Sequence, residues 1–111
     1  MNETGAPDPD DILQFAIDAL ADIREATLPP EKWEQFRSCL VLMNEALDRR
    51  DLVAVNRCRQ RIEALENLLG AKADLARDVR QPVPLRGQAD RLTDRLRREK
   101  GDGSEPDGRG R

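Results

Sequence analysis

Few residues of this chain have side chains that could catalyse a reaction or bind a metal ion. The 111 residues include two cysteines, Cys39 and Cys58, and no histidine. A Cys/His zinc site needs three or four such ligands, and nucleophilic catalysis of the Ser-His or Cys-His type needs an imidazole base. The sequence therefore predicts no catalytic residue, no metal site and no cofactor. We expect both thiols to be small buried side chains on apolar stripes, and a disulfide would require their helices to face each other.

Carboxylate pairs occur at helical spacing, as Asp18 with Asp22 and Asp74 with Asp78. Neither pair supplies enough ligands for a carboxylate metal site, so we expect both to lie on solvated helix faces. The seven glycines are isolated and mostly terminal, which argues against a phosphate-binding loop. These patterns together indicate a protein that is not an enzyme.

Charge is distributed unevenly along the chain. Residues 1–31 carry eight acidic side chains and one basic one, whereas residues 49–61 carry five arginines and one acid. Arg57 and Arg61 lie one turn apart on the third predicted helix, opposite its apolar stripe, which makes them candidate partner-binding residues. Such groups suit a solvated face, a protein-binding face or a recognition helix in a DNA groove. The net charge of −3 makes nucleic acid the less favoured partner.

The elements that position these residues are predicted to be helices. Apolar residues at helical spacing predict helices over about 9–26, 30–48, 51–69 and 85–100. Asp51 is the expected N-cap of the third helix, and Gly70 is its expected C-terminal stop. Residues 71–79 are ambiguous between coil and one or two helical turns.

The predicted fold class is therefore all-α, a small bundle of three to four amphipathic helices. One domain is expected over residues 9–100, with disordered ends at 1–8 and 101–111. Trp33, Phe36 and Phe15 are the expected aromatic core, and the short connection after residue 48 predicts an antiparallel helical hairpin.

Neither a membrane span nor a secretion signal is predicted. The longest apolar run, residues 39–43, has five residues, whereas a spanning helix needs about 20. The amino-terminal residues lack the basic start and apolar core of a signal peptide, so we expect a cytoplasmic protein.

The first predicted helix is apolar over more than half of its circumference. The other apolar residues of this helix already form a stripe wide enough to face the core, and Leu13 and Ile17 widen it further. Surplus apolar surface is typical of a docking site for a partner or a second copy, so Leu13 and Ile17 are candidate partner-binding residues. The alternative is that residues 71–79 fold back and cover both side chains.

A longer pattern resembles a known family. The run Leu28-Pro29-Pro30-Glu31-Lys32-Trp33 is followed by a helical seam and a polar turn, and a linker with prolines precedes a final helix. The later matching positions are Leu40, Met43, Ala46, Leu47, Asp51, Leu52, Pro82, Pro84, Arg86, Asp90, Leu92 and Leu96. Over about residues 12–96, the chain resembles the CATRA-associated small proteins, where CATRA refers to caspase and tetratricopeptide-repeat association. It departs from them at Arg50, where glycine is usual, at Asp90, where asparagine is usual, and at Asp94, where histidine is common.

The resemblance implies a non-enzymatic adaptor or accessory protein of a bacterial conflict system, acting in defence or programmed death. Its expected partner is a protein encoded nearby, such as a CATRA-domain protein, and a homo-oligomer is an alternative. The resemblance supplies no catalytic residues. A different hypothesis, drawn from the arginines alone, is a nucleic-acid-binding regulatory domain that uses the third helix.

Overall fold

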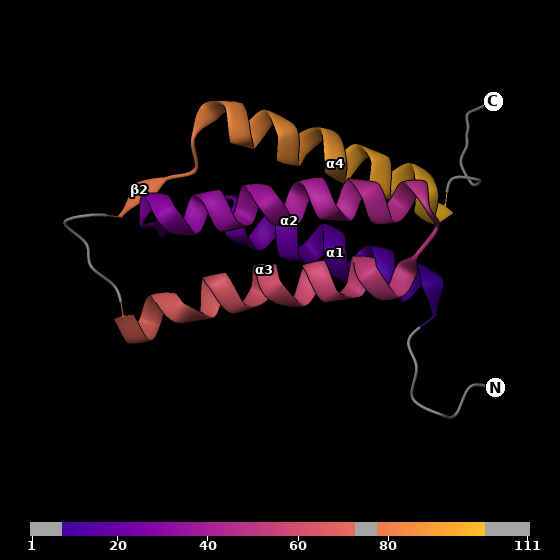
Figure 1. Ribbon diagram of the computed structural model, residues 1–111, viewed down its shortest axis with the longest axis horizontal. Helices are drawn as coiled ribbons and strands as arrows, with labels where there is room; N and C mark the ends of the chain where they lie inside the picture. Colours follow the sequence, from indigo (N-terminus) through magenta and orange to yellow (C-terminus); the bar gives the residue numbers. More distant parts are fainter. Residues whose placement is uncertain (1–7, 73–77, 102–111) are drawn as a thin grey trace.

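A computed structural model describes residues 8–72 and 78–101 of the chain. Four helices account for most of them: α1 (Pro9–Ile23), α2 (Pro30–Asp48), α3 (Leu52–Lys72) and α4 (Val83–Gly101). They run side by side as a bundle, and α2 and α3 form an antiparallel hairpin (Figure 1). The predicted all-α bundle is confirmed. Within the described ranges, no helix combines the length and the apolar character needed to cross a membrane.

Prolines and one aspartate determine where the helices begin. Pro9 and Pro30 each occupy the first turn of a helix, where the missing N–H has no intrahelical partner to lose. Asp51 caps α3, because its Oδ1 accepts a hydrogen bond from the Ala54 N–H at 3.1 Å. The same tolerance for proline lets α4 begin at Val83 with Pro84 in its first turn, two residues before the predicted start.

The predicted ends of two helices were wrong. The first helix ends at Ile23 instead of Ala26, since the chain extends into β1 (Thr27–Leu28) soon afterwards. The third helix continues through Gly70 to Lys72. Within the ambiguous segment 71–79, α3 includes residues 71 and 72, and Val79 starts β2 (Val79–Arg80). Residues 73–77 lie outside the described part. The ends expected to be disordered were 1–8 and 101–111; Gly101 instead belongs to α4, and residues 1–7 and 102–111 lie outside the described part.

A two-stranded sheet with two residues in each strand, which the sequence did not predict, joins distant segments. Strands β1 and β2 pair antiparallel, with Thr27 opposite Arg80 and Leu28 opposite Val79. Leu28 is buried, so the connection between α1 and α2 is anchored in the core and held against the segment that leads into α4.

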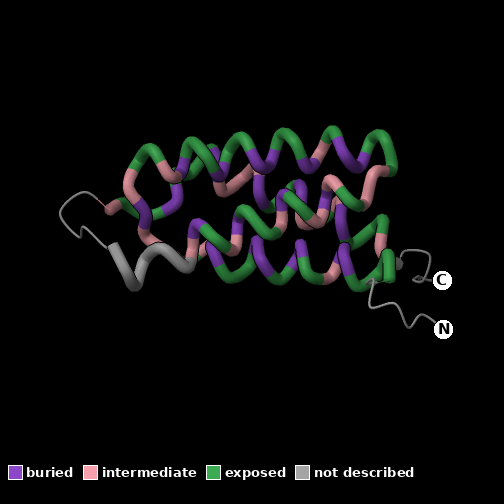
Figure 2. The backbone as a smooth tube through the Cα atoms, turned by 60° about the horizontal axis from the view of Figure 1, so that its bottom comes forward, coloured by how far each residue is buried: buried purple, intermediate pink, exposed green. Residues whose placement is uncertain are grey.

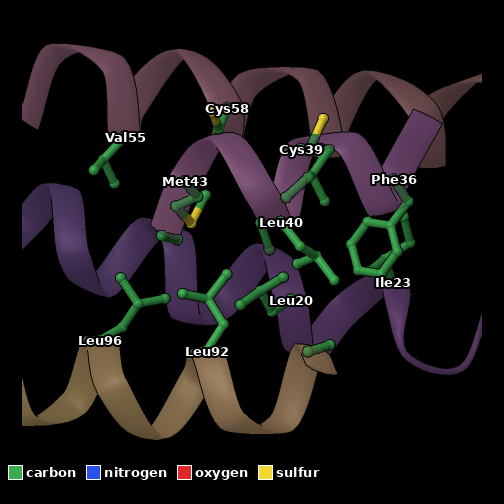
Figure 3. Close-up of a cluster of buried hydrophobic side chains, with 14 of the residues drawn as sticks. Leu20, Ile23, Phe36, Cys39, Leu40, Met43, Val55, Cys58, Leu92 and Leu96 are labelled. Carbon is green, nitrogen blue, oxygen red and sulfur yellow. The ribbon is translucent and has the colours of Figure 1, made fainter. Parts of the chain in front are cut away.

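The helices form a closed ring around one core. Helix α2 packs on α3, α3 on α1 and α1 on α4, and the smallest of these contacts closes the ring between α4 and α2. Buried residues follow the inner side of each helix (Figure 2). Side chains of all four helices meet in the interior, including Leu20, Met43, Val55 and Leu92 (Figure 3).

The expected aromatic core is confirmed in part. Trp33 and Phe36 are fully buried, with ring centroids 5.6 Å apart in an edge-to-face arrangement. Phe15, however, is 40% exposed, so its predicted place in the core was wrong. It sits at the edge of the α1 stripe and lies beneath the guanidinium of Arg59, 5.0 Å from the ring centroid.

Candidate protein-interaction surface

Leu13 and Ile17 do not form an exposed surface. They are 4% and 6% exposed, so the premise on which they were predicted to bind a partner is wrong. Helix α1 packs against two neighbours, α3 and α4, and a helix in that position needs apolar residues on both sides. Ile17 borders the α4 side of α1, next to Ala89. The alternative cover by residues 71–79 is therefore not needed, because α3 and α4 already enclose the wide stripe.

Arg57 and Arg61 are exposed, as predicted, but their surroundings differ from a bare polar face. Arg61 lines a hollow of about 410 Å³ between α2 and α3, together with Leu42 and Leu65. Arg57 lies one turn earlier on α3. Their role in partner binding stays a prediction.

Arg59 covers the edge of the core on the opposite side of α3. Its guanidinium hydrogen-bonds to Asn56 and to both oxygens of Glu63, at 3.0 and 3.1 Å, and it stacks on Phe15. Acidic side chains, including Asp22, Glu63 and Glu66, also lie on the α1–α3 side. Burial raises the pKa of Glu66, and the negative charges of Asp22 and Glu63 contribute less to this rise.

The cysteines are buried and unbridged. Cys39 on α2 and Cys58 on α3 are 4% and 5% exposed, and both are free thiols (Figure 3). Burial, with a smaller contribution from Cys58, raises the pKa of Cys39 to about 11, and burial also raises the pKa of Cys58. Thiols held in the neutral form are poor nucleophiles, and within the described residues no group of three or more potential ligands could hold a metal ion. Both cysteines therefore act as small buried side chains of the hydrophobic core.

Two aliphatic side chains that the sequence analysis did not single out stand on the outer face of α2. Val41 is 50% exposed and Leu42 is 42% exposed. We call this pair the α2 ridge. Leu42 borders the hollow toward α3, and Val41 borders a second hollow of about 430 Å³ toward α4. The ridge therefore separates two grooves, each with an apolar floor: Cys39 and Leu65 on one side, Leu40 and Leu92 on the other.

Arginines border the ridge on both sides. Arg61 stands on the α3 side, and Arg91, Arg95 and Arg98 stand on the α4 side. Arg95 is already engaged, because it bonds to Asp48 at 2.6 Å and to Asn44 at 3.2 Å. Arg91 and Arg98, by contrast, form no ion pair with any residue in the described ranges.

The run from Leu28 to Trp33 has a structural role. Leu28 is buried in β1, Pro30 opens α2, and the indole Nε1 of Trp33 donates a hydrogen bond of 2.9 Å to the carbonyl oxygen of Val79 in β2. This bond joins the start of α2 to the strand that precedes α4. We use the name β-clamp for the paired strands β1 and β2 together with this bond from Trp33 to Val79.

A family model described as CATRA-Associated Small Protein matches residues 15–100. The chain belongs to this family. The match begins inside α1 and ends within α4, so it includes both the β-clamp and the α2 ridge. No curated protein and no solved structure matches the chain.

Two departures from the pattern of the CATRA-associated small proteins now have a structural context. Arg50 has a φ of 57°, and the bonds Arg50 N–H to Leu47 O and Asp51 N–H to Ala46 O make the turn a Schellman motif. Glycine suits that left-handed position best, which explains why glycine is usual there. Asp90 accepts two hydrogen bonds from Arg24, at 3.2 and 3.1 Å, and so links the end of α1 to α4.

Proposed function

We propose that the protein is a non-enzymatic adaptor of a bacterial conflict system, which acts in the cytoplasm by binding a CATRA-domain protein encoded nearby. Membership of the CATRA-associated small protein family carries the proposal, because the family is named for that association. The α2 ridge supports it, since exposed aliphatic side chains beside apolar grooves are typical of a protein-binding surface.

The ridge also favours protein over nucleic acid as the partner. A phosphate backbone needs cations and gains nothing from Val41 and Leu42. Single-stranded nucleic acid would need exposed aromatic rings for stacking, and among the described aromatic side chains Phe15 alone is exposed, beneath Arg59 on another face.

Co-expression tests the proposal. The chain, tagged at one end, is produced together with the CATRA-domain protein of the neighbouring gene, and the complex is measured by affinity capture followed by size-exclusion chromatography. We expect a complex of defined stoichiometry that forms with micromolar affinity or better. The matched control is an unrelated acidic four-helix protein carrying the same tag. If the two proteins elute separately when each is present at tens of micromolar, this chain does not bind the CATRA-domain protein and the proposal is wrong.

A further inference from the structure

We infer that the α2 ridge binds an acidic amphipathic helix, and this inference rests on the proposed function for its physiological partner. The helix would lie along α2, place its apolar stripe on Val41 and Leu42, and direct acidic residues on both flanks toward the arginines of α3 and α4. Each part of this description follows from the geometry of the ridge.

The shape of the surface suits a helix. The ridge is a single step of α2 that separates two grooves, one toward α3 and one toward α4. A helix laid on α2 would place apolar side chains into both grooves, as in helix-in-groove recognition. The apolar part of the face is short, since Ser38 precedes it and Glu45 follows it one turn later. A contact this small corresponds to a transient, micromolar interaction.

The charges select an acidic partner. Arg61 flanks the ridge on one side, and Arg91 and Arg98 flank it on the other, without partners in the described ranges. In coiled coils, the residues that flank the apolar seam form the ion pairs that decide which helix is accepted. Arginines on both sides of an apolar stripe therefore favour a helix with glutamate or aspartate on both sides of its own stripe.

The same charges disfavour a second copy on this face. A symmetric dimer through the ridge would bring Arg61, Arg91 and Arg98 of each copy close to the same residues of the other, and like charges across an interface are repulsive. Among the described residues, three exposed acids lie along this side of α2. Glu34 and Asp48 already pair with Arg37 and Arg95, which leaves Glu45, and one acid does not balance three arginines.

The first test uses a synthetic peptide probe. A helix of about three heptads, with leucine on its seam and glutamate on both flanks, is titrated into the isotope-labelled protein and followed by NMR chemical shifts. We expect the changes to concentrate on residues 37–45 and around Arg61, Arg91 and Arg98. The same peptide with lysine in place of glutamate should bind at least about tenfold more weakly. Equal affinities, or changes centred on another face, would overturn the inference.

Matched variants locate the contact. Val41→Ala with Leu42→Ala should weaken peptide binding about tenfold, whereas Val53→Ala with Val83→Ala, at positions 63% and 80% exposed elsewhere, should not. Arg91→Glu should weaken binding several-fold at low salt, whereas Arg97→Glu, on the side of α4 that faces α1, should not. Circular dichroism of each of the four variants serves as the check that it folds. If each control variant weakens binding as much as its ridge counterpart, the inference is wrong.

The same variants in the complex with the CATRA-domain protein separate the two proposals. If that complex forms and is insensitive to the ridge variants, the inference fails and the proposed function stands. If the complex does not form but the peptide binds as described, the proposed function fails and the binding preference of the ridge stands. Concentration-dependent self-association abolished by the ridge substitutions would overturn the inference in favour of a second copy. Duplex DNA binding abolished by Arg91→Glu would overturn it in favour of nucleic acid.

Discussion

Trp33 is predicted to stabilise the fold through one hydrogen bond as well as through its size. Its indole Nε1 donates to the Val79 carbonyl at 2.9 Å, and a bond of this kind contributes about 0.5–1.5 kcal/mol. Trp33→Phe removes the bond and part of a fully buried ring system, and the resulting void adds about 1 kcal/mol. The expected loss in the free energy of unfolding is therefore about 2 kcal/mol. For a domain of this size, that loss lowers the Tm by roughly 8–16 °C.

The hydrogen bond can be separated from the packing. Benzothienylalanine at position 33 keeps the shape of the bicyclic ring and replaces the N–H donor with sulfur, so we expect a loss of about 1 kcal/mol from that change alone. Thermal and urea unfolding, followed by circular dichroism, measure both variants. Hydrogen exchange at Val79 and Arg80 should accelerate in both, because the β-clamp is weakened. If benzothienylalanine leaves the stability within about 0.3 kcal/mol of the wild type, the bond contributes nothing and Trp33 acts by packing alone.

Four further expectations follow from the core, the turn and the buried polar groups. Leu40→Ala should cost about 2–5 kcal/mol in urea unfolding, whereas Leu42→Ala on the exposed ridge should change stability by less than about 0.5 kcal/mol. Arg50→Gly should stabilise the protein by about 1 kcal/mol, because glycine adopts a φ of 57° without strain, and an unchanged Tm would contradict this reading of the turn. The neutral thiol of Cys39 is favoured in the fold, so its contribution to stability should be complete below about pH 9 and be lost as the pH rises through 11, by roughly 2–3 kcal/mol; Cys39→Ala should remove this part of the alkaline decline and leave the part that Cys58 causes. Gln81→Leu should preserve or raise the Tm, because neither polar atom of this buried amide has a hydrogen-bond partner among the described residues, and a clear drop would show that the amide is satisfied.

The helices were predictable because their signals are local. Apolar spacing and N-terminal prolines identify α1 and α2, apolar spacing identifies α4, and Asp51 identifies the start of α3. The β-clamp was not predictable in the same way. Each strand has two residues, and Thr27 and Arg80 are far apart in the sequence, so neither strand has a periodicity of its own. Its only local signal is Trp33, whose indole needs a partner when it is buried.

The burial of Leu13 and Ile17, which the wide stripe of α1 does not predict, has a geometric reason. The apolar width that a helix needs depends on how many neighbours it contacts. Helix α1 lies between α3 and α4, so its sides turned toward both are buried. The number of contacts that a helix makes is a property of the bundle and cannot be obtained from the helix alone.

The α2 ridge had a sequence signal of the opposite kind. Residues 39–43 are five consecutive apolar side chains, and successive residues of an α-helix are about 100° apart, so such a run goes once around the helix. Helix α2 has two neighbours, α3 and α4, but its side turned away from the core has none among the described residues, so it cannot bury all five. In the structure Cys39, Leu40 and Met43 are buried, whereas Val41 and Leu42 are left outside. In α1 the wide stripe is confined to the sides that α3 and α4 cover, whereas in α2 a short run encircles the helix and no described neighbour covers its outer side. The second pattern, combined with unpaired arginines on both flanks, is the one that indicates a partner.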